Sequence, residues 1–181
     1  MRLVPLDLPG AFRIVPQPAR DHRGSFARLF CAETFAAHGL ATGWVQMNRS
    51  CTVARGTVRG LHLQTPPFAE DKLVRCVAGA VFDVLVDLRP GPTHGRWTAL
   101  TLCAQTGEAA YIPAGIAHGF QALTDGVELH YCLSAPFAPD HQGGLHPADP
   151  DLAIPWPLPV RNLSARDAAL PSLDSLREPA P

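Results

Sequence analysis

The sequence predicts an all-β fold, a barrel or sandwich of short strands, on three observations. The 181-residue chain is rich in turn formers, with 19 Pro and 15 Gly, and only 17% of its residues are charged. Short strand-like segments recur between these turn formers. Apolar residues make up 46% of the chain, more than a disordered segment carries. The length fits one domain over residues 1–181, with a core at about 12–140 and a C-terminal arm at 141–181.

Five segments are predicted strands, and in chain order they are residues 44–50, 57–64, 72–78, 81–89 and 96–103. The alternation is clearest in "VFDVLVDLR", where Phe82, Val84, Val86 and Leu88 alternate with Val81, Asp83, Leu85 and Asp87. This period of two indicates a strand with one more apolar face.

A β-hairpin is predicted in "HGFQALTDGVELHYCL", residues 118–133. Asp125 and Gly126 supply the positive φ values that a two-residue type I′ turn needs. This turn would pair Phe120 with Tyr131 across the two strands. We therefore expect His118 and Tyr131 to lie on one wall of the protein.

Helices are predicted to be few and short. Residues 32–39 fit two turns that end at Gly39. After Asp140 the chain becomes Pro-rich, which predicts an extended arm. Within this arm, Ser164 fits the N-cap of a short helix with Asp167 at its third position.

Composition excludes several classes of partner. The formal net charge of −1 gives no basic field for nucleic acids or membranes. The first ten residues, "MRLVPLDLPG", lack the apolar run of a signal peptide, and the densest apolar segment, "CVAGAVF", is too short to span a bilayer. Five cysteines without metal-binding spacing indicate reduced thiols. We expect a cytoplasmic protein.

Two histidine-bearing segments narrow the fold to a jelly-roll barrel of the cupin type. In "GEAAYIPAGIAHGF", four residues stand at the spacing of the second cupin motif: Gly107, Pro113, Gly115 and His118. A strand that lines a polar cavity also explains why "RGLHLQ" carries Arg, His and Gln together.

The first cupin motif is incomplete. His62 is present, but Gln64 stands where a second histidine is usual, and Glu70 is the nearest carboxylate. A first-row metal in a cupin needs about three His or carboxylate ligands, so no metal site is expected. A metal-dependent dioxygenase or isomerase that uses His62, Gln64, Glu70 and His118 stays open as an alternative.

The chain resembles the dTDP-4-dehydrorhamnose 3,5-epimerase family. Eight segments occur in that family's order: "DHRGSF", "VQMNRS", "RGLHLQ", "KLVR", "DVLVDLR", "IPAGIAHGF", "HY" and "LSARD". Each is weak alone, but together they are specific and extend from about residue 12 to 173. The resemblance implies a metal-free, cofactor-independent cupin, usually a homodimer. Members epimerise nucleoside-diphosphate-linked 4-keto-6-deoxyhexoses at C3, C5 or both, in deoxysugar or polysaccharide biosynthesis.

The resemblance also implies four catalytic residues. His62 is the base, Asp167 orients it, Lys72 faces the C4 oxygen, and Tyr131 is the acid on the opposite face. The chemistry fits, because loss of a hydrogen beside a ketone gives an enolate that needs a near-neutral base, a cation and an acid. Each residue also has a structural interpretation: an inward-facing histidine, a helix-capping aspartate, a surface lysine and a core tyrosine.

Further residues are implied in substrate binding. The nucleotide positions are Arg23, Phe26, Gln46, Asn48 and Arg59, and His118 lines the sugar pocket. Arginine suits a diphosphate because its planar fork donates two parallel hydrogen bonds.

Two positions depart from the family pattern. Arg28 replaces a glutamate that faces the nucleotide in the family, so the identity of the nucleobase is open. CDP and GDP sugars remain alternatives to dTDP sugars. Phe137 replaces a tyrosine six residues after Tyr131, which suggests that one carbon is epimerised more effectively than the other. A sugar-nucleotide binding module that has lost its chemistry is the remaining alternative.

Overall fold

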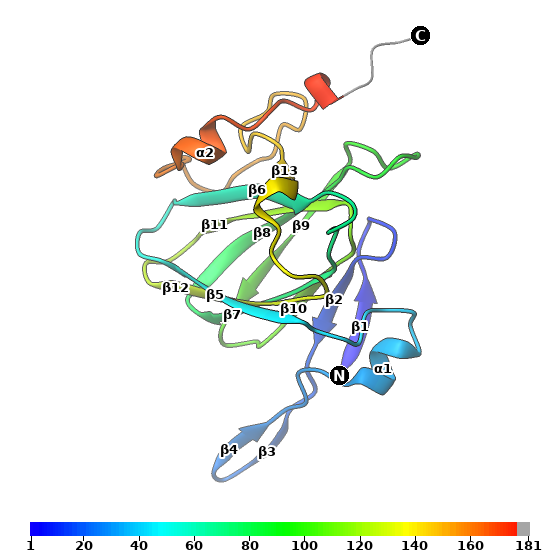
Figure 1. The fold of residues 1–181 in the computed structure, drawn as a ribbon. Coiled ribbons are helices and arrows are strands. Elements are labelled where there is room, and N and C mark those ends of the chain that lie inside the picture. The colour runs from blue at the N-terminus through cyan, green and yellow to red at the C-terminus, as the bar shows by residue number, and fades with distance from the viewer. Residues whose placement is uncertain (177–181) are drawn as a thin grey trace.

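The computed structural model describes residues 1–176, which form two antiparallel sheets that face each other (Figure 1). The six-stranded sheet has the order β1 (Arg2–Pro5), β2 (Phe12–Val15), β10 (Ala109–Ile112), β7 (Lys72–Ala78), β12 (Val127–Leu133) and β5 (Gln46–Thr52). The five-stranded sheet has the order β13 (Gln142–Gly144), β6 (Val58–Gln64), β11 (Ile116–Ala122), β8 (Ala80–Asp87) and β9 (Trp97–Cys103). The predicted all-β jelly-roll class is confirmed, and each of the five predicted strands is present.

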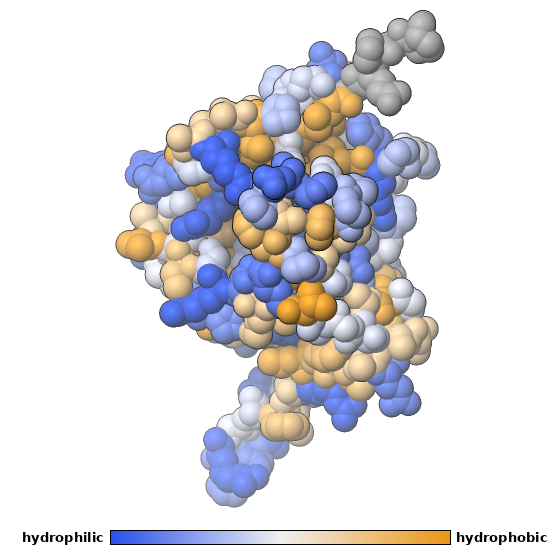
Figure 2. Space-filling model, in the orientation of Figure 1, coloured by the Kyte–Doolittle hydropathy of each residue, from blue (hydrophilic) through white to orange (hydrophobic). Residues whose placement is uncertain are grey.

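A separate hairpin, β3 (Ala19–Asp21) and β4 (Gly24–Phe26), pairs only with itself among residues 1–176. It projects away from the barrel in Figure 1, and Figure 2 shows that its tip is hydrophilic. Both strands are exposed along their whole length. Sequence alone gave no reason to place this segment outside the barrel.

The two faces of β8 are buried against different parts of the chain. Val81 and Leu85 belong to the core between the sheets. Val84 and Val86 belong to a second cluster, which the C-terminal arm completes with residues such as Leu152. The more apolar face of this strand therefore lies under the arm, while the face that carries Asp83 and Asp87 turns toward the barrel interior. Burial on both faces stabilises the strand through the hydrophobic effect.

The predicted pairing of Phe120 with Tyr131 is wrong. Strand β11 pairs with β6 and β8, whereas β12 pairs with β5 and β7. The segment around Gly126, whose φ is +65°, thus crosses from one sheet to the other. Local turn chemistry does not decide between the two arrangements, and the crossing lets every residue of β11 be buried in the five-stranded sheet. His118 and Tyr131 still meet, because their rings pack edge to face between the sheets with centroids 5.8 Å apart.

The helices are short, as expected. Helix α1 (Ala32–Ala36) is followed by Gly39 at a φ of +70°. Helix α2 (Ala165–Ala168) begins after Ser164, whose Oγ accepts the backbone N–H of Asp167 at 3.0 Å, so the predicted cap is confirmed. Two 3₁₀ turns complete the elements, η1 (Pro139–His141) and η2 (Asp174–Leu176). None of the helices found between residues 1 and 176 has the length and apolar character to cross a membrane.

Candidate active site

A cavity of about 700 Å³ is lined by residues of both sheets and of the C-terminal arm. Eight of the twelve residues predicted for the site line it: Asn48, Arg59, His62, Lys72, His118, Tyr131, Phe137 and Asp167. All four predicted catalytic residues are in this set. The cavity thus gathers side chains from β5, β6, β7, β11, β12 and α2, which are far apart in the sequence.

His62 and Asp167 form a close pair at one wall. His62 Nε2 lies 2.7 Å from Asp167 Oδ1, and Asp167 Oδ2 accepts the backbone N–H of Gly60 at 3.2 Å. Because the cap at Ser164 uses only the backbone N–H of Asp167, the carboxylate is free for this pair. The capping and the catalytic interpretations of Asp167 are therefore compatible.

Burial lowers the pKa of His62, while the hydrogen bond and charge of Asp167 raise it, and burial is the larger effect. The imidazole is therefore neutral at pH 7. If Nε2 carries the proton shared with Asp167, Nδ1 has a free lone pair. The side chain is 32% exposed and lines the cavity, so a bound molecule can contact it. This is the state a general base needs.

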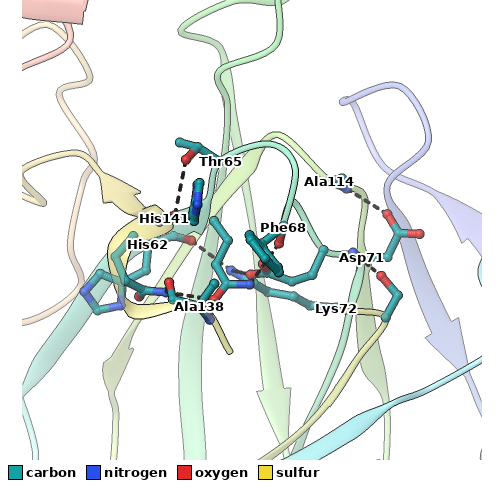
Figure 3. Close-up of polar contacts among 12 residues, drawn as sticks. His62, Thr65, Phe68, Asp71, Lys72, Ala114, Ala138 and His141 are labelled. Atoms are coloured by element: carbon teal, nitrogen blue, oxygen red, sulfur yellow. Dashed lines mark hydrogen bonds and ion pairs between the residues drawn. The ribbon is translucent and has the colours of Figure 1, made fainter. Parts of the chain in front are cut away.

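Lys72 is buried, so its interpretation as a surface lysine is wrong. Its Nζ donates to the backbone carbonyl of His62 at 2.9 Å and lies 3.2 Å from Glu70 Oε1 (Figure 3). Burial lowers the pKa of Lys72, and the charge of Glu70 opposes this. The amino group of Lys72 is thus desolvated and lies close to His62, and when protonated it would stabilise nearby negative charge strongly.

Tyr131 lies on β12 and reaches the cavity from the six-stranded sheet, opposite the sheet that carries His62. Burial, together with the charge of Asp83, raises its pKa well above the usual range. The phenol thus keeps its proton and can donate it. His118, whose Nε2 lies 2.7 Å from Asp83 Oδ1, stands against the Tyr131 ring.

Sequence reasoning missed Asp83, which does not line the cavity but pairs with His118, which does. Asp83 is fully buried, and its Oδ2 has no hydrogen-bond partner within the described chain. A charged residue inside the apolar alternation of residues 81–89 was the available signal.

The arm also supplies lining residues that sequence reasoning missed: Asn162, Ser164 and Arg166. Arg166 Nη2 donates to Gln142 Oε1 at 2.9 Å. Arg59, on strand β6, donates through Nε to Thr52 Oγ1 at 3.0 Å. Two guanidinium groups therefore border the same cavity, an arrangement that suits a diphosphate.

Four predicted binding residues do not line the cavity. Arg23 and Phe26 lie on the projecting hairpin, where Arg23 pairs with Asp21 at 2.7 Å and Phe26 is 81% exposed. Arg28 follows the hairpin and contacts Cys31 Sγ at 3.9 Å. Gln46 lies beside the cavity and hydrogen-bonds two residues that line it, Asn48 and Phe137.

The donor set of the metal-dependent alternative does not fit a metal centre. His62 and His118 are each bound to a carboxylate, and both polar atoms of the Gln64 side chain are occupied by protein partners. Within residues 1–176, no group of three or more His, Cys, Asp or Glu side chains is placed to hold a metal ion.

Comparison with known proteins identifies the family. The sequence model of dTDP-4-dehydrorhamnose 3,5-epimerase matches residues 5–175. The chain is 42% identical over 165 residues to the dTDP-4-dehydrorhamnose 3,5-epimerase of Sinorhizobium fredii, which covers 90% of this chain and 85% of that protein. It is 44% identical over 169 residues to the dTDP-4-dehydrorhamnose 3-epimerase of Streptomyces niveus, with 92% and 81% coverage.

Solved structures agree. A 4-keto-6-deoxy sugar epimerase from the novobiocin biosynthetic gene cluster of Streptomyces spheroides has a TM-score of 0.92 to this structure. The two chains are 42% identical, and the match covers 97% of this chain and 88% of the other. The predicted resemblance is confirmed, and the chain belongs to the dTDP-4-dehydrorhamnose 3,5-epimerase family.

Proposed function

We propose that this protein epimerises C3, C5 or both carbons of a nucleoside-diphosphate-4-keto-6-deoxyhexose, for deoxysugar or polysaccharide biosynthesis. The observation that carries the proposal is the His62–Asp167 pair, which shares one cavity with Lys72 and Tyr131. His62 comes from β6 and Tyr131 from β12, strands of opposite sheets. A base and an acid on opposite walls are what inversion of a carbon requires.

In the proposed mechanism, neutral His62 removes the hydrogen beside the C4 ketone as a proton. The electrons of the broken C–H bond form a carbon–carbon double bond, and the C4 oxygen becomes an enolate next to Lys72. Tyr131 then donates its proton to the opposite face of the carbon, and the ketone reforms. His62 releases its proton to solvent and Tyr131 regains one, so the cycle moves protons only and calls for no redox cofactor.

The substitution at Phe137 supports a preference for one carbon. Phe137 lines the cavity, is 57% exposed and has no hydroxyl to donate. Because Tyr131 is then the acid of the site, a carbon that does not lie beneath it is inverted more slowly. The relative from Streptomyces niveus is named a 3-epimerase, which fits this preference.

We also propose that two copies of the chain form a homodimer. Strand β5 ends its sheet, and the apolar side chains of Val45, Met47 and Val53 on and beside it are 62%, 65% and 84% exposed. An open strand edge with apolar side chains favours pairing with a second strand. In a dimer, Arg23 and Phe26 on the hairpin can reach the nucleotide of the other copy. Arg28 would then influence which nucleobase is bound.

The five cysteines support a reducing, cytoplasmic location, since all of them are free thiols. Cys76 is buried, and burial raises the pKa of its thiol to about 11. Such a thiol is inert and behaves as a small core residue.

The test is incubation of the protein in D2O with dTDP-, CDP- and GDP-linked 4-keto-6-deoxyhexoses, followed by NMR of the recovered sugars. We expect deuterium at C3 or C5 with at least one nucleotide, and its loss in His62→Ala with nucleotide binding retained. Nucleotide binding without any exchange would instead identify a binding module. Equal labelling rates at both carbons would remove the single-carbon preference.

A further inference from the structure

Two glutamine side chains hydrogen-bond to three backbone groups at Phe137 and its two neighbours in the chain. Gln64 Nε2 donates to the carbonyl of Pro136 at 3.1 Å, and Gln64 Oε1 accepts the N–H of Ala138 at 2.7 Å. Between them, the N–H of Phe137 donates to Gln46 Oε1 at 3.0 Å. The two glutamines come from β6 and β5, which belong to opposite sheets. The backbone of this segment is thus fixed from both sides.

Gln64 uses its full hydrogen-bonding capacity. Besides the two bonds to the Phe137 segment, its Nε2 donates to the carbonyl of Phe68 at 2.9 Å, and its Oε1 accepts from Gln142 Nε2 at 2.9 Å. A buried primary amide has two donors and two lone pairs, and here each has a partner. Figure 3 shows this network around Phe68 and Ala138, next to His62 and Lys72.

An imidazole at this position has only two ring nitrogens, so it cannot make these four bonds. The residue that occupies a metal-ligand position of the first cupin motif therefore has a different use here. It ties the strand that carries His62 to the segment that carries Phe137. Phe137 itself stays 57% exposed and lines the cavity, so its ring is available to a bound sugar.

We propose that Gln64, together with Gln46, is a positioning residue that sets where the Phe137 ring lies and thereby the ratio of proton exchange at C3 and C5. This inference rests on the proposed epimerase function. The two carbons flank the ketone, and His62 and Tyr131 stand at fixed places on the barrel walls. Which carbon lies between them depends on how the sugar ring is rotated, and an aromatic ring against the sugar limits that rotation.

The test variant is Gln64→Glu, with the ratio of deuterium uptake at C3 and C5 as the readout. A carboxylate still accepts from Ala138 and Gln142, but it cannot donate to the carbonyls of Phe68 and Pro136. We expect the ratio to change by roughly tenfold, since misplacement by about 1 Å costs up to about a hundredfold in rate. Gln46→Met, at a partly exposed position, removes the bond to the Phe137 N–H and is expected to change the ratio in a protein that folds readily.

The matched control is Gln121→Glu. Gln121 is also buried, and it clamps the backbone of Leu158 by donating at 2.8 Å and accepting at 2.9 Å. Leu158 does not line the cavity. We expect this variant to lose thermal stability, as Gln64→Glu does, and to keep the wild-type exchange ratio.

A second control asks whether Gln64 acts through Phe137. In a Phe137→Ala background, Gln64→Glu is expected to leave the exchange ratio unchanged. A wild-type ratio in both Gln64→Glu and Gln46→Met, or an undiminished effect of Gln64→Glu in the Phe137→Ala background, overturns the inference.

The failure of the proposed function has a different signature, which is no exchange by the wild-type protein with any of the sugars. The positioning role is then measured by fluorine NMR of a fluorophenylalanine at position 137. Gln64→Glu has to shift or broaden that signal while Gln121→Glu leaves it in place. An unchanged signal in Gln64→Glu overturns the inference independently of activity.

Discussion

Nε2 of His62 lies 2.7 Å from Oδ1 of Asp167, although 105 positions separate the two residues in the chain. The pair depends on three local features: the strand that carries His62, the cap at Ser164 that starts α2, and the N–H of Gly60 that holds the second carboxylate oxygen. Asp167 therefore has a fixed orientation before any substrate binds, which is how a carboxylate keeps a catalytic imidazole in place.

Asp167→Asn is expected to move the acid limb of the pH–rate profile to lower pH. Burial lowers the pKa of His62 and Asp167 raises it, so loss of the carboxylate charge lowers that pKa further. The base then stays neutral to lower pH, but it is poorly oriented, and kcat should fall by roughly 10²- to 10⁴-fold. The measurement is kcat/KM for deuterium exchange from pH 4 to 9. A limb that moves to higher pH would contradict the assigned pair.

Glu70→Gln is expected to move the alkaline limb to lower pH. Burial lowers the pKa of Lys72, and the charge and hydrogen bond of Glu70 raise it. Without the carboxylate, Lys72 loses its proton at lower pH, and the enolate loses its cation. The same pH series measures this limb, with Lys72→Met as the reference that lacks the cation at every pH. An alkaline limb that stays in place would mean that Lys72 does not carry the charge.

Tyr131→Phe is expected to separate exchange from inversion. Without the phenol, protonation of the opposite face falls by roughly 10²-fold or more. His62 can still remove a proton and return solvent deuterium to the same face. NMR should therefore show deuterium in the unchanged stereoisomer with little epimer. If exchange and inversion both fall to the level of His62→Ala, the assignment of proton removal to His62 and proton donation to Tyr131 is wrong.

Gly60→Ala is expected to destabilise the fold by about 2 kcal/mol or more. Gly60 has a φ of +119°, and an added Cβ would lie 2.5 Å from Gly119 Cα and 2.8 Å from the carbonyl oxygen of His118. Gly24→Ala is the control, since Gly24 has a φ of +132° but no heavy atom within 4 Å of an added Cβ. Urea unfolding of the two variants separates backbone strain from the close approach of β6 and β11. Equal losses would show that the close approach contributes nothing.

The sequence predicted much of the fold and the four proposed catalytic residues, because strand alternation and ordered motifs are local signals. It failed where the answer depends on long-range packing. The turn at Asp125 and Gly126 fits a hairpin as well as a crossing between sheets, and only the pairing of each strand with distant strands decides between them. Asp83 was missed because alternation shows which residues share a face but not that this face meets His118 between the sheets.

The arm that completes the His62 pair also sets an order of events during synthesis. Every strand of the two sheets has been synthesised once residue 144 is added, whereas Asp167 is added later. The proposed pair of His62 and Asp167 is thus complete only after the arm has been made and has folded onto the five-stranded sheet. A protease that cuts between β13 and α2 is therefore expected to lower activity and also to destabilise the barrel, because the same arm covers the outer face of β8.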